Sequence, residues 1–207
     1  GLSFRTEGQP PVGNATAGAL PPYDAVYVGD TEEKVIYLTF DAGYEAGYTE
    51  QILDVLKKHD VKAAFFVVGT YIENNPELVR RMAEEGHIVG THTWHHYNMS
   101  PIADLQSFTR ELQSVADAYR EATAEEMPPY YRPPQGVYSE ENLRMAQALG
   151  YRTVFWSLAR RIALAEAGDH DVLPALGIRL AQCIVELCLV DLDDNFSLSS
   201  ASSRQSW

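Results

Sequence analysis

Short apolar runs that alternate with helix-like segments are the feature of this 207-residue chain that most restricts its fold. Five such runs are predicted to be strands, at residues 35–40, 63–68, 87–90, 130–132 and 153–156. Between them lie four segments with helical patterns, at residues 49–59, 75–86, 100–124 and 139–149. Strands that alternate with helices favour a parallel sheet, because parallel neighbours need a long crossover connection. We therefore predict an α/β fold whose sheet is either open or closed into a barrel.

The two ends of the chain do not follow this alternation. Residues 1–34 are rich in proline and glycine without periodicity, which is typical of an irregular arm. Residues 35–158 are expected to form the barrel portion. In the C-terminal segment, 159–207, polar residues interrupt an apolar run at helical spacing, which predicts an amphipathic helix over about 175–192 and no membrane span. The serine-rich end of this segment is predicted to be a disordered tail.

Composition excludes some classes of protein. The net charge of −13 argues against nucleic acid as a partner, because no basic patch offsets phosphate repulsion. Two cysteines, Cys183 and Cys188, do not make a disulfide framework. The chain starts at Gly1, so we expect a processed form, from which an export signal would already have been removed.

Three of the six histidines lie within five residues of each other, in the segment GTHTWHHYN at 90–98. Neutral imidazole is a common metal ligand. His92 and His96 are four residues apart, a spacing that would put both rings on one face of a helical turn. The alternative is an exposed polar loop in which histidine has no special role. On spacing alone these two interpretations are equally open.

Two further polar residues follow predicted strands. Asp41 lies in TFDAGY after the first strand, and Arg132 begins RPPQG after the fourth. Because active sites of parallel barrels lie where strands end, we expect Asp41, His92 and Arg132 to converge. Each residue also has an ordinary explanation, since Asp41 could cap the following loop and Arg132 could form a structural ion pair.

In this order, the motifs TFDAG, HTWHH and RPPQG resemble those of the polysaccharide deacetylases, the NodB-homology domains of carbohydrate esterase family 4. The similarity runs from about Tyr27 to Leu158. The segments most like the bacterial peptidoglycan and muramic acid deacetylases are IYLTFDAGYEAGYTEQILDVLKK, EGHIVGTHTWHH and YRPPQGVYSEENLRMAQALGYRTVFWSL. The resemblance implies a distorted, incomplete (β/α) barrel. It also implies a divalent metal, usually Zn²⁺, that activates water to hydrolyse an N-acetyl group on a sugar.

The resemblance also implies a role for each matching residue. Asp41 would be the general base, and Arg132 would orient it. His92 and His96 would hold the metal. The backbone N–H of Gln135, in the substrate-binding part of the site, would help to stabilise the oxyanion. His95 would lie outside the metal site.

The chain departs from the family pattern at two places. Ala42 stands where the family usually has a second, metal-binding aspartate. After Leu158 the chain lacks the Asp-Trp motif and the Leu-x-Leu-x-His strand, whose histidine protonates the leaving amine. His170 follows no apolar strand, so we do not expect it to replace that acid. This break indicates a shifted reading frame, a fusion or a truncated homologue.

From the resemblance we expect a metal-dependent N-deacetylase that acts on acetylated polysaccharide, with peptidoglycan as the first candidate and the cell envelope or exterior as its location. Chitin-type oligosaccharides and xylan acetyl esters are alternatives within the family. Loss of the C-terminal histidine would impair turnover. The rival interpretations are a catalytically inactive carbohydrate-binding relic of the same fold, and a relic whose residues 1–158 do not fold alone.

Overall fold

The computed structural model describes residues 2–3, 12–13, 19–27, 37–156, 158–161 and 184–188. Most of their strands form one sheet, in the order β3-β8-β7-β6-β5-β4-β10-β9. The parallel part of this sheet consists of β3 (Ala25–Val26), β8 (Arg152–Val154), β7 (Tyr130–Tyr131), β6 (Ile88–Thr91), β5 (Ala64–Val67) and β4 (Tyr37–Ala42). Two antiparallel strands extend it beyond β4, namely β10 (Ile184–Cys188) and β9 (Leu158–Arg161). A separate antiparallel pair joins β1 (Leu2–Ser3) to β2 (Val12–Gly13).

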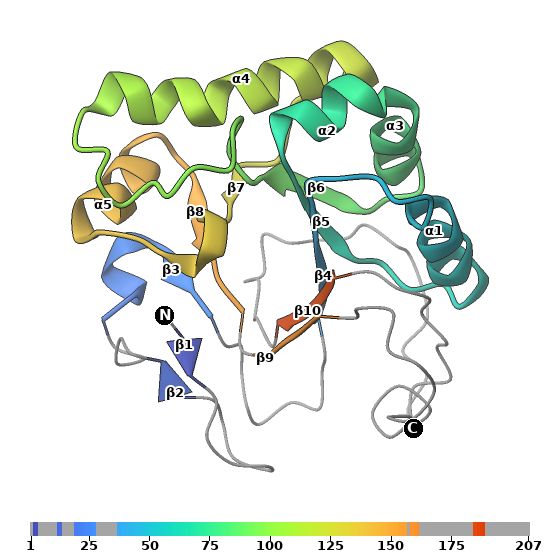
Figure 1. Cartoon of the computed structure of the whole chain (residues 1–207), viewed down its shortest axis with the longest axis horizontal. Coiled ribbons are helices and arrows are strands. Elements are labelled where there is room, and N and C mark those ends of the chain that lie inside the picture. The colour runs from blue at the N-terminus through green and yellow to red at the C-terminus, as the bar shows by residue number, and fades with distance from the viewer. Residues whose placement is uncertain are drawn as a thin grey trace.

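The parallel strands curl into a half-barrel with the helices around its outside (Figure 1). Within residues 37–156 the helices are α1 (Thr49–Lys58), α2 (Gly69–Asn74), α3 (Pro76–Glu84), α4 (Leu105–Thr123) and α5 (Glu140–Ala148). Short 3-10 turns occur at η1 (Pro21–Tyr23) and η2 (Pro134–Gly136). No helix in the described part of the chain is long and apolar enough to cross a membrane. The predicted α/β fold and incomplete (β/α) barrel are confirmed.

The helix boundaries have local causes that the periodicity did not reveal. Helix α2 was not predicted; it ends at Asn74, because the next residue, Asn75, has non-helical φ −138° and ψ 51°. Pro76 follows, and a residue before proline is disfavoured in the helical region. The helix predicted from residue 100 begins at Leu105, because the Asp104 side chain accepts a hydrogen bond from the Ser107 N–H at 2.7 Å and caps it.

The main core cluster lies between the sheet and helices α1 to α4. On the sheet side, the rings of Phe40 and Phe65 stack with centroids 4.9 Å apart. On the helix side, α1 buries Ile52, Leu53 and Leu56, which recur at helical spacing. Figure 1 shows α4 lying across α2 and α3 on one side of the molecule. This packing fixes the strand ends that carry the polar residues of interest.

Both chain ends differ from the sequence-based expectations. Within the arm predicted as irregular, residues 25–26 form β3 and pair with β8, so part of the arm belongs to the sheet. The helix predicted over 175–192 is wrong at residues 184–188, which form β10 and pair with β4. An uncovered β4 edge would leave backbone N–H and C=O groups unpaired, and a strand satisfies them where a helix cannot. The rest of that range, His170 and the serine-rich tail lie outside the described residues.

His87, just before β6, is a buried histidine on the opposite end of the strands from Asp41. Its Nδ1 accepts a hydrogen bond from the Ala63 N–H at 3.2 Å, so Nε2 carries the proton of the neutral ring. Nε2 lies 4.0 Å from Oε2 of Glu85, and neither atom has a hydrogen-bond partner among the described residues. Burial lowers the pKa of His87 from 6.5 to about 4.

This histidine makes the stability of the fold sensitive to acid. Because its pKa is lowered in the folded state, the neutral ring stabilises the protein above about pH 6.5, and that contribution is lost as the pH falls towards 4. We expect the free energy of unfolding to drop by roughly 2–3 kcal/mol between pH 7.5 and 4.5 from this group alone. Urea unfolding of wild type and His87→Asn at both pH values measures this. The asparagine side chain keeps an acceptor for the Ala63 N–H but does not titrate, so an equally steep drop in the variant would contradict the assignment.

Candidate active site

The predicted convergence of strand ends is present in the structure. Asp41 lies near the end of β4, His92 directly follows β6, and Arg132 directly follows β7. The parallel register aligns these ends, since Asp41 pairs with Phe66 of β5 and Thr91 of β6 pairs with Tyr131. The three side chains therefore meet at the carboxyl edge of the sheet.

Arg132 is fully buried and holds Asp41 in place. Its Nη1 donates a hydrogen bond to Oδ1 of Asp41 at 2.8 Å. Nε and Nη2 donate to the carbonyl oxygens of Val154 and Phe155, at 3.1 and 3.2 Å. The guanidinium carbon also lies 4.1 Å from the ring centroid of Phe66. With its donors directed at several fixed acceptors, the guanidinium cannot turn without leaving buried groups unpaired.

His92 is held in one tautomer. Its Nδ1 lies 2.8 Å from the carbonyl oxygen of Arg132, and a carbonyl can only accept, so Nδ1 carries the proton. Burial lowers the pKa of His92 more strongly than neighbouring Asp41 raises it, which keeps the ring neutral near pH 7. The lone pair of Nε2 is therefore available, and this atom lies 3.4 Å from Oδ2 of Asp41.

His96 approaches His92, although the two do not share a helical turn. The ring centroids lie 4.8 Å apart with planes at 66°. The premise of a helical turn was wrong, because Thr93 and His96 have left-handed φ values of 68° and 58°. The turn depends on threonine hydroxyls: Thr91 Oγ1 accepts the Thr93 N–H, and Thr93 Oγ1 accepts the His96 N–H, both at 3.1 Å.

The imidazoles of His92 and His96 are of a chemical type that binds metal ions, because a neutral ring nitrogen offers a lone pair. A ligating histidine usually donates its other ring N–H to a fixed acceptor, as His92 does to the Arg132 carbonyl. Across the described residues, no three His, Cys, Asp or Glu side chains are grouped as a metal cluster. Ala42, where a further carboxylate would be expected, ends β4 without a ligand atom. Among the described residues, Asp41 supplies the carboxylate beside these imidazoles, with Oδ2 at 3.4 Å from Nε2 of His92.

His95 points away from the pair and towards α4. Its Nδ1 lies 2.6 Å from Oε1 of Glu111, while Oε2 of Glu111 accepts the backbone N–H groups of Trp94 and His95, both at 3.1 Å. Trp94 packs over Gly69, where an added Cβ would lie 2.2 Å from the indole, so a side chain there would displace the loop. Sequence reasoning missed Glu111. It could have been noticed as a charged residue on the apolar face of the predicted helix, between Phe108 and Leu112, where a buried carboxylate needs hydrogen-bond partners.

The turn after Arg132 presents Gln135 at the surface. Gln135 is exposed, with a left-handed φ of 61°, between buried Pro134 and Gly136. Gly136 also has a positive φ, and an added Cβ would lie 2.6 Å from the ring of Trp156. This turn therefore needs glycine, and the oxyanion role of the Gln135 N–H stays a prediction.

Glu45, in the loop after Asp41, has a structural role. It accepts hydrogen bonds from the backbone of Tyr48 at 2.8 Å, from the Tyr71 hydroxyl at 3.0 Å and from the Thr49 hydroxyl. Burial raises the pKa of Glu45, but hydrogen bonds from the Thr49 and Tyr71 hydroxyls and from the backbone of Thr49 and Gly47 together outweigh burial and lower it. The carboxylate thus fixes the start of α1 and the loop that follows β4.

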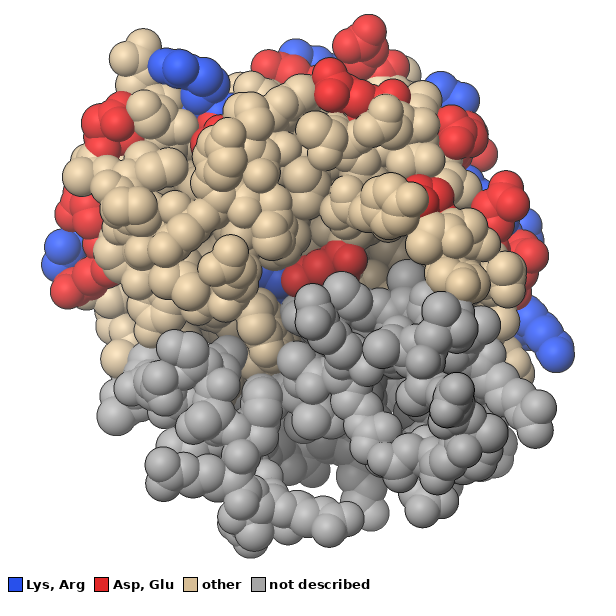
Figure 2. All heavy atoms as spheres, viewed as in Figure 1, with Lys and Arg blue, Asp and Glu red and all other residues tan. Residues whose placement is uncertain are grey.

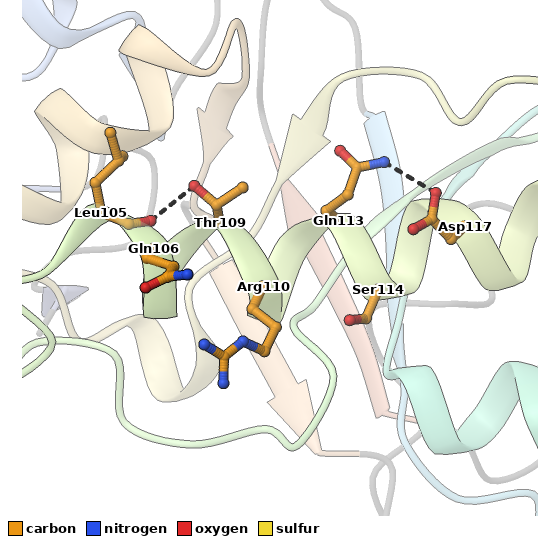
Figure 3. Close-up of a pocket in the computed structure, with 7 residues that line it drawn as sticks. All are labelled: Leu105, Gln106, Thr109, Arg110, Gln113, Ser114 and Asp117. Carbon is orange, nitrogen blue, oxygen red and sulfur yellow. Dashed lines mark hydrogen bonds between the residues drawn. The ribbon is translucent and has the colours of Figure 1, made fainter.

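A hollow on the outer face of α4 contains none of these residues (Figure 3). Its lining comes from one helix, and consists of Leu105, Gln106, Thr109, Arg110, Gln113, Ser114 and Asp117. Polar side chains there bond locally, as between Gln113 and Asp117 at 3.1 Å. The hollow is an exposed helix face and is distinct from the site at the strand ends.

Glu111 should contribute strongly to the stability of the histidine loop. Glu111→Ala leaves two N–H groups and an imidazole without their acceptor, so we expect the free energy of unfolding to fall by about 2–3 kcal/mol. Glu111→Gln keeps one acceptor oxygen and should lose less. Urea unfolding at pH 7 measures both variants. An alanine variant as stable as wild type would show that the loop does not depend on Glu111.

Sequence comparisons place these features among known proteins. The sequence profile of the polysaccharide deacetylase family matches residues 28–154. An uncharacterised 30.6 kDa protein of Geobacillus stearothermophilus is 49% identical over 160 residues, which is 77% of this chain and 60% of that protein. Peptidoglycan-N-acetylmuramic acid deacetylase PdaA of Bacillus subtilis is 47% identical over 152 residues, 73% of this chain and 57% of that protein. The chain thus spans less than two thirds of the length of these relatives.

Solved structures show the same fold. The structure of Bacillus subtilis PdaA, a family 4 carbohydrate esterase, superposes with a TM-score of 0.72 at 45% identity, covering 76% of this chain and 68% of PdaA. BA3943 of Bacillus anthracis, described as a pseudoenzyme of the same family, superposes with a TM-score of 0.60 at 28% identity, covering 65% of this chain and 47% of BA3943.

Proposed function

The chain belongs to the polysaccharide deacetylase family, and we propose that it hydrolyses N-acetyl groups on a cell-wall polysaccharide with the help of a divalent metal. The observation that carries this proposal is the convergence of Asp41, Arg132, His92 and His96 at one edge of the sheet. The name of PdaA supports peptidoglycan as the polymer. A substrate of this kind would be met in the cell envelope or outside the cell.

His92 and His96 would hold the metal, and Zn²⁺ suits a pair of neutral imidazoles. When bound, the metal would polarise the acetamide carbonyl and lower the pKa of a water molecule. With Ala42 in place of a carboxylate, water or substrate oxygens would complete the coordination. Affinity should accordingly be lower than at a site with three protein ligands.

Asp41 would act as the general base. Its Oδ1 is held by Arg132 at 2.8 Å, which leaves Oδ2 on the side of His92. Oδ2 would take a proton from the attacking water as the water oxygen bonds to the acetyl carbon. The N–H of Gln135 would donate a hydrogen bond to the carbonyl oxygen as negative charge develops there.

The last step would break the bond between the acetyl carbon and the sugar nitrogen, which must gain a proton to leave. After Leu158, His170 is the one histidine in the sequence, and it lies outside the described residues. Residues 159–207 contain no Leu-x-Leu-x-His segment. We therefore propose that amide hydrolysis by these 207 residues is impaired.

The rival function is binding of a glycan without turnover. Ala42 favours it, and the description of BA3943 as a pseudoenzyme supplies a precedent within the family. The intact geometry of the Asp41–Arg132 pair favours the enzyme, because a pure binding module does not need a fixed base. Acetate release separates the two.

The first prediction from this proposal concerns the metal. His96→Ala should abolish tight binding of Zn²⁺, because it removes one of two side-chain ligands, and the exposed position of His96 spares the fold. His95→Ala is the matched control and should keep the wild-type affinity, since His95 faces Glu111. Isothermal titration calorimetry measures both, and equal affinity in the His96 variant would refute the ligand assignment.

A second substitution tests whether Asp41 is the general base. Asp41→Asn keeps an oxygen acceptor for Arg132, so the fold and Zn²⁺ affinity should survive. Acetate release from an activated acetyl ester should fall by about 10²- to 10⁴-fold or to background, because the proton acceptor is lost. Full activity with intact Zn²⁺ binding would move the base to another residue.

A further inference from the structure

Two of the loops that carry the candidate site each expose a tyrosine side chain. In the described part of the chain, the large apolar side chains with high exposure are Tyr44, Tyr97 and Leu105, at 87, 57 and 49%. Tyr44 follows Asp41 by three residues, and Tyr97 directly follows His96. Single exposed apolar residues are common on protein surfaces, so exposure alone decides nothing.

Tyr97 differs from the other two because its ring is supported. It stacks on the imidazole of His95, with centroids 4.8 Å apart and planes at only 6°. The imidazole is in turn fixed by Glu111, which is almost buried and also binds the backbone of this loop. Glu111, His95 and Tyr97 thus form a brace from α4 to the surface, and the ring at its end is both exposed and oriented.

The loop that carries this ring also carries His92 and His96 of the candidate site. Figure 1 shows the loop between β6 and α4 running alongside α4 across the middle of the view. In the same view, charged side chains lie mainly around the edge of the described surface. Its middle is largely uncharged apart from an acidic patch with a small basic area beside it (Figure 2). An exposed and oriented aromatic ring suits a pyranose ring, whose axial C–H groups form an apolar face that packs on aromatic rings.

We propose that Tyr97, braced by His95 and Glu111, is a sugar-binding platform for the glycan ring next to the acetamido sugar in the catalytic site. The proposal rests on the proposed function for the identity of the glycan. The preformed stack lowers the ordering cost of binding, because the tyrosine ring is oriented before the sugar arrives. The hydroxyl of Tyr97 need not form a hydrogen bond to the sugar, since the face of the ring makes the contact.

The test measures binding of a tetrasaccharide of alternating N-acetylglucosamine and N-acetylmuramic acid, and of N-acetylglucosamine alone, by calorimetry or ligand-observed NMR. Using the Asp41→Asn protein without added metal makes the result independent of turnover. Tyr97→Ala should weaken tetrasaccharide binding about 5-fold or more, from the loss of one aromatic stacking contact. Tyr97→Phe should bind like the parent, and neither change should alter binding of the monosaccharide.

The brace itself is tested by His95→Ala, which should weaken tetrasaccharide binding by a smaller factor while Zn²⁺ affinity stays unchanged. Thermal unfolding of each variant checks that the fold is intact. Equal tetrasaccharide affinity in Tyr97→Ala and parent, or a matching loss for the monosaccharide, would overturn the platform while leaving the catalytic proposal standing. A parent protein that binds no tetrasaccharide at millimolar concentration would overturn it as well.

Discussion

The buried guanidinium of Arg132 is the interaction on which the site depends. Its side chain fixes Asp41 at 2.8 Å and binds two carbonyls at the end of β8, while its own carbonyl fixes the tautomer of His92. Its backbone N–H bonds to Thr91 at 3.0 Å, which ties β7 to β6. A buried charge is tolerated only when it is paired and fully hydrogen-bonded. The Asp41 carboxylate, the His92 imidazole and the strand ends around Arg132 are therefore held in one arrangement.

Much of this arrangement could be predicted from the sequence, because alternating strands and helices impose a parallel sheet and parallel strands end at one edge. Asp41, His92 and Arg132 each follow an apolar run, and this placed them together correctly. The approach of His96 was predicted for the wrong reason. Its turn is formed by threonine hydroxyls and left-handed residues, which residue spacing does not encode.

The features that escaped prediction depend on contacts between segments distant in sequence. The carboxylate of Glu111 acquires its hydrogen-bond partners only when α4 packs against the loop that contains Trp94 and His95. The strand at 184–188 forms because β4 offers an open edge, whereas its local pattern of polar residues indicated a helix. In both cases tertiary pairing of backbone N–H groups determines the outcome, and a local window of sequence does not contain that partner.

We propose that Asp41 still activates water, whereas residues 159–207 supply no Leu-x-Leu-x-His proton donor for the leaving nitrogen. Alkoxides leave without prior protonation far more readily than amide anions, so the two steps can be separated by substrate. Acetate release by the Zn²⁺-loaded chain should be compared for an activated acetyl ester and for acetylated peptidoglycan fragments. We predict measurable, Asp41-dependent hydrolysis of the ester and amide turnover near background. Amide turnover at a full enzymatic rate would contradict this claim, and so would an ester rate unchanged by Asp41→Asn.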